Sequence, residues 1–279
     1  MINVLFCGND KVFDGILSSM ISILKRTKTE NTFHFYIYTM DASFVNDKFL
    51  PINDQMLNFL EKLAKSYNEN NIVSLIDVGE LYNKEFRNCP NEQCYCSPYT
   101  LLRLLLDEVE NMPNDKLLYL DVDLLFNKDI TLLYNIDVTG YEYAAGRDQY
   151  GKFLIQPNYI NGGVLLFNME KIRKTKLLTK ARELIRQKHL PFADQSAILR
   201  STTKRKMLPQ CFNDQRRVND KTVIRHFAQK LYWLPYPHVE NIKQWNLNRY
   251  FKVFNYKELN DIIYDYIYMK ECFIRNKEI

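Results

Sequence analysis

Glycine is scarce in this sequence, with only 8 in a chain of 279 residues. A phosphate-binding loop of the P-loop type needs several glycines between a strand and a helix. The segment after the first predicted strand, Cys7-Gly-Asn-Asp-Lys11, contains a single glycine. Nucleotide hydrolases of the P-loop class are therefore excluded.

Long hydrophobic runs are also missing, because none approaches the roughly 18 residues that a membrane-spanning helix requires. The first ten residues lack a basic n-region, so we expect a first strand rather than a signal peptide. Six cysteines are scattered along the chain, and only Cys89, Cys94 and Cys96 lie close together. Their spacing matches no common zinc pattern. We therefore expect a cytoplasmic protein with reduced thiols.

A strong charge imbalance is absent too, since the net charge is +5 and the pI is about 8.7. That charge does not imply nucleic-acid binding, and the basic residues lack interleaved aromatics. Many of them fall within residues 172–206. This segment is either an ordinary solvated helix face or a surface attracted to an anionic membrane or substrate.

Strand-like and helix-like segments alternate along the chain, which predicts an α/β fold. The alternation predicts a mostly parallel sheet flanked by helices, elaborated by a helical C-terminal part that docks on the body. Strands are expected at residues 3–7, 33–38, 72–76, 116–126, 142–146, 159–168 and 223–227. Helices are expected at residues 12–24, 56–67, 98–109, about 169–189, 192 onward and 256–267.

The predominantly apolar segment at residues 116–126 contains two carboxylates, Asp121 and Asp123, with one residue between them. In an extended backbone these side chains point the same way. A divalent cation between them would relieve their repulsion, and such sites commonly complete the metal shell with phosphate oxygens. The alternative is simple turn chemistry at a strand end.

In other segments, single residues suggest a functional role, and most of them also have a purely structural interpretation. Arg103 lies among leucines and needs an anionic partner, in a ligand or in a salt bridge. Gly162 and Gly163 permit either close backbone approach or a bulge. Asp194 is either a site residue or the N-cap of a helix. His226 ends a short predicted strand.

Taken in order, several of these motifs resemble those of family 8 glycosyltransferases, over residues 1–235. The motifs are Phe6-Cys-Gly-Asn-Asp10, Tyr99 to Leu104, Tyr119-Leu-Asp-Val-Asp123, Asn161-Gly-Gly-Val-Leu-Leu-Phe-Asn168, Asp194-Gln195 and His226-Phe227. The resemblance implies a GT-A fold and transfer of a sugar from a UDP-sugar with retention of configuration. Because the sequence has no internal repeat, low-complexity tract or obvious linker, we expect one domain of 1–279, with a nucleotide-binding half (1–125), a donor-sugar and acceptor half (126–235) and a helical C-terminal tail (236–279).

The resemblance assigns roles by position. The expected metal ligands are Asp121, Asp123 and His226, and this mixed oxygen and nitrogen set suits Mn²⁺ better than Mg²⁺, although Mg²⁺ is possible. Residues expected to contact the nucleotide, diphosphate or sugar are Cys7, Asn9, Lys11, Arg103, Val122, Asn161 and Lys230. Residues expected at the reacting centre are Asp148, Asp194 and Gln195.

The sequence departs from the family pattern at several positions. Ser196 replaces an aspartate after Asp194-Gln195, and Asn9 replaces a nucleotide-side aspartate. After His226 the family has a glycine and then Lys-Pro-Trp, whereas Gln229 stands at the glycine position here. Lys230 is the candidate for the phosphate-binding lysine.

The predicted function is a UDP-hexose-dependent retaining glycosyltransferase. The donor would be UDP-glucose or UDP-galactose, and the acceptor a saccharide or a lipid-linked glycan, as in bacterial lipopolysaccharide or other glycan biosynthesis. A glutamine amide is a poor nucleophile, so a front-face displacement is favoured. Peripheral association with the inner membrane face would suit a lipid-linked acceptor.

Two other functions compete with this prediction. A non-catalytic UDP-sugar-binding module of the same fold is the alternative, although such a module would be expected to lose metal ligands. A sugar-nucleotide pyrophosphorylase would need a glycine-rich, basic loop after the first strand, which is absent.

Overall fold

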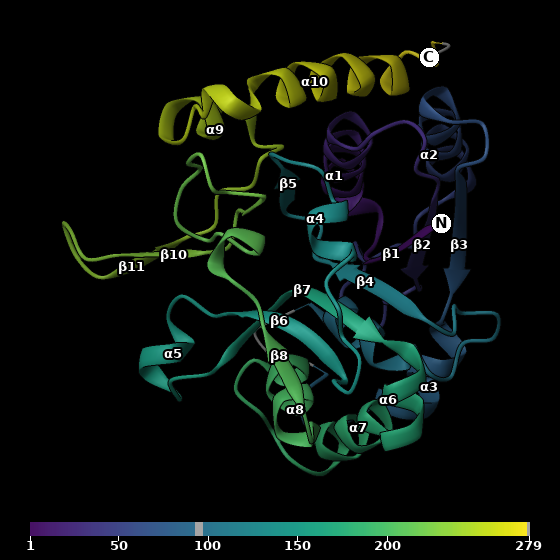
Figure 1. Cartoon of the computed structure of the whole chain (residues 1–279), viewed down its shortest axis with the longest axis vertical. Helices are drawn as coiled ribbons and strands as arrows, with labels where there is room; N and C mark the ends of the chain where they lie inside the picture. The colour runs from purple at the N-terminus through teal and green to yellow at the C-terminus, as the bar shows by residue number, and fades with distance from the viewer. Residues whose placement is uncertain (93–96, 278–279) are drawn as a thin grey trace.

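The computed structural model describes residues 1–92 and 97–277 of the chain (Figure 1). Within this part, a seven-stranded sheet has the order β3-β2-β1-β4-β7-β6-β8. Its strands are β1 (Ile2–Cys7), β2 (Phe33–Thr39), β3 (Ile72–Asp77), β4 (Lys116–Leu120), β6 (Tyr143–Arg147), β7 (Ile160–Asn168) and β8 (Arg205–Met207). The predicted strands at residues 3–7, 33–38, 72–76, 142–146 and 159–168 correspond to five of these.

Most of the sheet is parallel, as predicted. Strand β1 pairs in parallel with β2 and β4, β2 pairs in parallel with β3, and β6 with β8. Strand β7 alone runs the other way and is antiparallel to β4 and β6. The pairing of Leu120 with Val164 brings the end of β4 beside the start of β7.

Helices cover both faces of this sheet, because its strands are apolar on both sides. Figure 1 shows one set of helices above the sheet and another below it. The upper set is α1 (Phe13–Arg26), α2 (Asp54–Tyr67) and α10 (Asn260–Ile274). The lower set is α3 (Gly79–Phe86), the 3₁₀ helix η2 (Pro98–Leu105), α6 (Met169–Thr175), α7 (Leu177–Gln187) and α8 (Ala193–Ser201). The α/β prediction is therefore confirmed.

The C-terminal helix α10 docks on the body of the molecule, as the sequence predicted. Phe273 lies 4.7 Å from Phe13 between ring centroids, and Arg26 pairs with Asp261 at 2.7 Å. These contacts attach α10 to α1. No helix in residues 1–92 and 97–277 is long and apolar enough to cross a membrane.

Several elements differ from the sequence prediction. The segment predicted as one strand at 116–126 is broken after Leu120, and β5 (Leu124–Phe126) pairs instead with β9 (Ile224–His226). The predicted helix at 98–109 is the shorter 3₁₀ helix η2. The N-cap of α8 is Phe192, so the interpretation of Asp194 as that cap was wrong.

The sequence analysis did not predict several short helices and strands. The most prominent is a hairpin that projects from the body in Figure 1. Its strands are β10 (Lys230–Tyr232) and β11 (His238–Glu240), and the other short helices are α4 (Thr131–Tyr134), α5 (Gly151–Leu154) and α9 (Leu247–Val253). Cys94 and Cys96, part of the predicted cysteine cluster, lie outside the described residues.

Candidate active site

Asp121 and Asp123 lie in the connection between β4 and β5, at the carboxyl end of a central strand. Ligands of open α/β sheets commonly bind at this edge. The backbone N–H of Asp121 donates to the carbonyl of Gly163 at 2.8 Å, and the Tyr119 hydroxyl donates to Asp121 Oδ1 at 2.7 Å. The carboxylates therefore occupy a loop fixed by its neighbours, and not the continuous strand that the sequence predicted.

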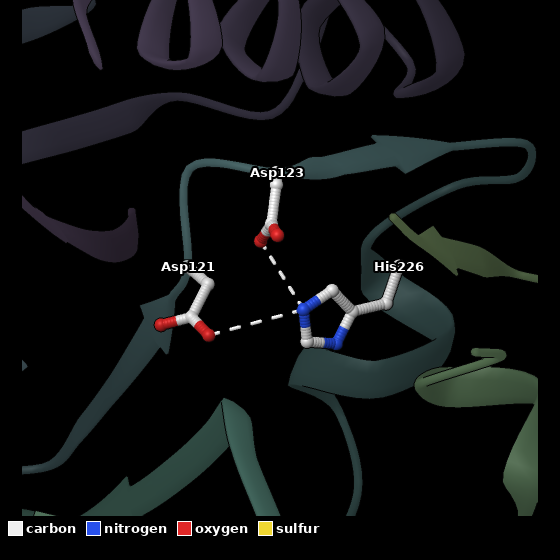
Figure 2. Close-up of side chains that lie close together, drawn as sticks. All are labelled: Asp121, Asp123 and His226. Carbon is white, nitrogen blue, oxygen red and sulfur yellow. Dashed lines mark ion pairs between the residues drawn. The ribbon is translucent and has the colours of Figure 1, made fainter. Parts of the chain in front are cut away.

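The imidazole of His226 faces both carboxylates, as Figure 2 shows. Its Nε2 lies 3.1 Å from Asp123 Oδ1 and 3.9 Å from Asp121 Oδ2. Each residue offers one ligand atom, and these atoms all lie within 4.8 Å of one another. The structure thus brings together the three residues that the sequence predicted as metal ligands.

A residue that the sequence analysis missed, Asn213, fixes the orientation of this imidazole. Its side-chain oxygen lies 2.9 Å from His226 Nδ1 and can act only as an acceptor. Nδ1 therefore carries a proton, and Nε2 is the ring nitrogen that faces the carboxylates and is available to a metal. Outer partners of this kind hold metal-binding histidines in the ligating tautomer.

Gly163 has no side chain, and a side chain at this position would enter the space occupied by the candidate metal ligands. A Cβ atom at this position would lie 2.4 Å from His226 Cε1 and 2.8 Å from Asp121 Oδ2. Such contacts would displace two of the three candidate ligands. Both interpretations of this glycine pair apply, because Gly163 closely approaches functional side chains and the register of β7 against β6 shifts between the pairs Ala145–Leu165 and Arg147–Ile160, which enclose both glycines.

Arg103 is a buried cation between the metal-ligand candidates and Asp194. Its Nη2 lies 3.3 Å from Asp121 Oδ1, its Nε lies 3.0 Å from Asp194 Oδ2, and its guanidinium stacks 4.0 Å from the Tyr119 ring centroid. Burial raises the pKa of Asp194 to about 6, and the charge of Arg103 opposes that rise. Arg103 therefore has salt-bridge partners of its own and still borders the candidate site.

Three further predicted residues form hydrogen bonds along the same edge. Asn161 donates from Nδ2 to Asp148 Oδ2 at 2.8 Å, so the predicted donor-sugar residues Asp148 and Asn161 are paired. The backbone N–H of Gly162 donates to Gln195 Oε1 at 2.6 Å. These bonds orient the side chains next to the carboxylate cluster.

The predicted nucleotide residues are more dispersed. Cys7 and Asn9 are buried around the end of β1, whereas Lys11 is exposed and pairs with Asp10 at 3.0 Å. Burial raises the pKa of the Cys7 thiol, although Arg103 opposes that rise. The carbonyl of Val122 already accepts hydrogen bonds from Ser19 Oγ at 3.1 Å and Gln244 Nε2 at 3.0 Å. The carbonyl of Val122 is therefore occupied, and the backbone N–H is the polar group of Val122 that could contact a nucleotide.

The lysine that contacts the carboxylates is Lys243, whereas the sequence predicted Lys230 as the phosphate-binding lysine. Lys230 donates to the carbonyl of Arg216 at 3.2 Å and lies 4.7 Å from the Phe254 ring centroid. Lys243, in contrast, forms an ion pair with Asp123 Oδ2 and donates to the carbonyl of Phe227 at 3.2 Å. Burial would raise the pKa of Asp123, but Lys243 and His226 hold it below its usual range.

The sequence does contain a pattern that could have identified Lys243, but this pattern lies further from His226 along the chain than we expected. Lys243-Gln-Trp245 has a lysine and a tryptophan at the spacing of the Lys-Pro-Trp pattern that the resemblance led us to expect closer to His226. The β10–β11 hairpin separates this segment from His226. Trp245 packs against α1, since a Cβ on Gly15 would lie 2.7 Å from its ring. Asn213, by comparison, lies in a loop with no periodic or motif signal.

Solved structures share this architecture. LgtC, described as a galactosyltransferase and solved with donor and acceptor sugar analogs, is 18% identical, with a TM-score of 0.60 over 94% of this chain and 100% of its own. GlyE of Streptococcus pneumoniae TIGR4 is 19% identical, with a TM-score of 0.64 over 100% of this chain and 66% of its own. The chain has the GT-A fold of these glycosyltransferases.

Sequence comparison gives the family. A Haemophilus influenzae protein, provisionally named a glycosyltransferase, is 28% identical over 190 residues, which are 64% of this chain and 52% of the relative. The chain thus spans about half the length of that curated relative. Residues 3–230 match the sequence model described as Glycosyl transferase family 8, and this match includes the Asp121–Asp123–His226 cluster. The chain belongs to glycosyl transferase family 8.

Proposed function

We propose that this protein is a metal-dependent retaining glycosyltransferase that moves a hexose from UDP-glucose or UDP-galactose to a saccharide or glycoconjugate acceptor. The observation that carries the proposal is the cluster of Asp121, Asp123 and His226, whose ligand atoms lie within 4.8 Å of one another. Family membership supports the reaction class. The donor, the acceptor and the stereochemistry belong to the proposal.

The residues of the cluster fit a divalent cation. Two carboxylates and a neutral imidazole suit Mn²⁺, and Asn213 already holds His226 in the ligating tautomer. Gly163 leaves the necessary space. A bound cation would neutralise the charge that develops on the departing diphosphate.

Lys243 fits a second role at the diphosphate. Its ammonium already lies against Asp123 and comes from a segment with the Lys-x-Trp spacing of the family motif. When a metal and a nucleotide occupy the site, the ammonium can leave Asp123 and bind a phosphate oxygen. Lys243 therefore replaces Lys230 in our assignment of the phosphate-binding lysine.

The donor sugar would lie beside Arg103, Asp148, Asn161, Asp194 and Gln195. Arg103 is oriented by the ion pair with Asp194, so Asp194 acts as a positioning residue for a cation at the donor. Asp148 holds the amide of Asn161 in the same way. Prealigned dipoles and charges of this kind stabilise a charged transition state without reorganisation.

Gln195 does not suit the role of a covalent nucleophile. An amide oxygen is weakly nucleophilic, and Gln195 Oε1 already accepts the N–H of Gly162 at 2.6 Å. This arrangement favours a front-face displacement, in which the acceptor hydroxyl attacks on the side that UDP leaves. Its proton would pass to the leaving phosphate oxygen, and positioning would supply much of the rate.

Titration of UDP into the purified protein tests the nucleotide and metal parts of the proposal. We expect binding with Mn²⁺, weaker binding with Mg²⁺, and its loss with chelator or in Asp123→Ala. Arg275→Ala removes a charge from an exposed side chain paired with Glu271 on α10 and separates general electrostatics from metal chelation. Binding that ignores metal and Asp123→Ala would instead favour a non-catalytic UDP-sugar-binding module.

Turnover is tested with UDP-glucose and UDP-galactose by following UDP release and the anomeric configuration of the product by NMR. The proposal requires release that depends on Mn²⁺ and on an acceptor, together with retained configuration. An inverted product would contradict the front-face mechanism.

A further inference from the structure

Two apolar protrusions extend from the same side of the molecule, the β10–β11 hairpin and the short helix α5 (Figure 1). The hairpin exposes Trp233 by 69% and Leu234 by 83%, and α5 exposes Phe153 and Leu154 by 79% each. Side chains of this size are rarely left in water together without a partner. Neither protrusion has a role in the proposed chemistry.

The two protrusions are joined at their bases. The backbone N–H of Leu231 in β10 donates to the Tyr150 hydroxyl, just before α5, at 2.9 Å. Gln215 bonds to the segment that precedes α5, because it accepts the N–H of Gln149 at 3.0 Å and donates to the carbonyl of Arg147 at 3.2 Å. The apolar tips therefore project from one connected base.

This base carries positive charge. Arg147, Arg216 and Arg217 are exposed, and none forms an ion pair with any residue that the structure describes. Lys230 donates to the carbonyl of Arg216, which places these arginines at the foot of the hairpin. Lys152 adds a cation 4.9 Å from the Phe153 ring centroid. Exposed cations thus surround the base of the two apolar tips.

We infer that these tips insert into the surface of a lipid bilayer that contains anionic headgroups. Tryptophan and tyrosine are favoured at the boundary of headgroups and acyl chains, aliphatic tips enter the apolar layer, and cations bind anionic headgroups. The hairpin adds a further aromatic, since Tyr236 is exposed as well. The membrane contact thus involves residues 147–155 and 216–239.

The composition of the tips distinguishes a bilayer from two other partners. A saccharide is recognised by aromatic faces combined with hydrogen-bonding groups, and the exposed aliphatic side chains of Leu234 and Leu154 offer none. A second copy of the chain would need broad complementary surfaces, whereas these are narrow, separate protrusions. A bilayer accommodates such tips without shape complementarity.

The basic segment at 172–206 is a weaker candidate for this contact. Arg182 is buried and pairs with Glu108 at 2.7 Å and with Asp107, and Arg186 pairs with Glu85. These two cations are neutralised within the protein, and Phe192 is the only large hydrophobic side chain of residues 172–206 that is exposed. Of the two interpretations of this segment, we therefore favour the solvated surface and assign the membrane contact to the two protrusions.

The protrusions adjoin the proposed active site. Helix α5 follows Asp148, and the hairpin begins four residues after His226. Insertion of both tips would therefore bring the site near the bilayer surface, where a lipid-linked acceptor would be available. This last step rests on the proposed function, but the membrane contact itself does not.

Tryptophan fluorescence provides a direct test, because the chain has only two tryptophans, Trp233 and Trp245. In Trp245→Phe, the remaining emission reports on the hairpin tip. We expect a blue shift and quenching by brominated lipid when vesicles of phosphatidylcholine and phosphatidylglycerol are added. In the matched variant Trp233→Phe, the remaining Trp245 packs against α1 and neither change is expected.

Vesicle co-sedimentation measures the affinity with the full chain. The double variants Trp233→Ser/Leu234→Ser and Phe153→Ser/Leu154→Ser should each partition at least about tenfold less. Arg147→Gln/Arg216→Gln should remove the preference for anionic over pure phosphatidylcholine vesicles. Leu132→Ser, which removes an exposed leucine of α4, is the matched control and should behave as the parent.

Several outcomes would overturn the inference. Equal sedimentation of the parent and both double variants would show that the tips do not insert. Self-association without lipid that the same variants abolish would assign the tips to a second copy. A Trp233 shift with soluble oligosaccharide but not with vesicles would assign them to a glycan.

Binding of UDP with Mn²⁺ is measured on the same double variants. It should equal that of the parent, because none of the substituted residues lies in the proposed site. Loss of vesicle binding with intact UDP binding therefore separates the membrane contact from the proposed catalytic function. Failure of UDP binding in the parent would refute the catalytic proposal and leave the membrane result standing.

Discussion

Gly163 lies where any side chain would enter the candidate metal site. In Gly163→Ala the new Cβ would lie 2.4 Å from His226 Cε1 and 2.8 Å from Asp121 Oδ2, so both ligands must move. We expect about 10- to 100-fold weaker Mn²⁺ binding, the loss typical of a disturbed outer partner. Titration of Mn²⁺, with the free ion followed by electron paramagnetic resonance, measures this affinity.

The neighbouring glycine provides the control for this prediction. In Gly162→Ala the Cβ would lie 3.2 Å from Arg103 Nη1 and 3.3 Å from Gln195 Oε1, neither of which is a candidate metal ligand. This variant should retain most of the Mn²⁺ affinity. Equal losses in the two variants would mean that the strand as a whole, and not the cluster, responds to the added methyl group.

Lys243 should affect binding of the metal and of the nucleotide in opposite directions. In Lys243→Met the ammonium no longer competes for Asp123, so Mn²⁺ alone should bind more tightly. Binding of UDP with saturating Mn²⁺ should weaken about 10- to 100-fold, because a charged hydrogen bond to phosphate contributes about 1.5–3 kcal/mol. Isothermal titration calorimetry measures both quantities.

Lys230→Met is the matched control, because Lys230 bonds to the carbonyl of Arg216 and not to a carboxylate of the cluster. Its UDP affinity should match that of the parent. A loss in Lys230→Met but not in Lys243→Met would restore the assignment made from the sequence.

At the residue scale, the sequence identified residues that the structure brings together where a motif is local. Asp121 and Asp123 are two residues apart after an apolar run, and His226 ends a short strand, so each carries its own signal. Lys243 was missed because an unpredicted hairpin separates it from His226. Asn213 was missed because its role depends on a contact 13 positions away in the chain.

At the scale of elements, α10 is attached to the body through an aromatic side chain. Phe273 lies 4.7 Å from Phe13 and 5.3 Å from Phe59 between ring centroids, and so joins α10 to α1 and α2. We expect Phe273→Ala to lower the free energy of unfolding by about 2–4 kcal/mol, because Phe273 is only partly buried. Urea denaturation followed by circular dichroism measures the change.

Tyr268→Ala serves as the control in the same helix, since this side chain is exposed. Its effect should stay within about 0.5 kcal/mol. A similar loss in both variants would indicate that helix propensity, and not aromatic packing, determines the stability of α10.

Elements with a strong period were predictable, and irregular ones were not. Helix α1 and strand β7 are long and apolar enough for their pattern to identify them. The break between β4 and β5 was missed because residues 117–126 are hydrophobic apart from the two aspartates. That break depends on pairing of β5 with β9, about a hundred residues later in the chain.

At the scale of the whole molecule, the mostly parallel sheet was predictable from alternating strands and helices, but its order was not. No local sequence feature of β7 indicates that this strand runs antiparallel between β4 and β6. This reversal nevertheless places Gly163 beside Asp121, since β7 begins where β4 ends. The site is therefore a product of topology as well as of motifs.

Ligand binding at this topological junction should stabilise the entire fold, because the ligands of the cluster come from the β4–β5 connection and from β9. A ligand at 100 times its Kd stabilises the native state by about 2.7 kcal/mol. For a chain of this size, that corresponds to a rise in Tm of about 5 °C. We expect this rise with UDP and Mn²⁺ together, and its reversal by chelator. Asp123→Ala should show no rise, whereas an equal rise with UDP and chelator would separate nucleotide binding from the metal cluster.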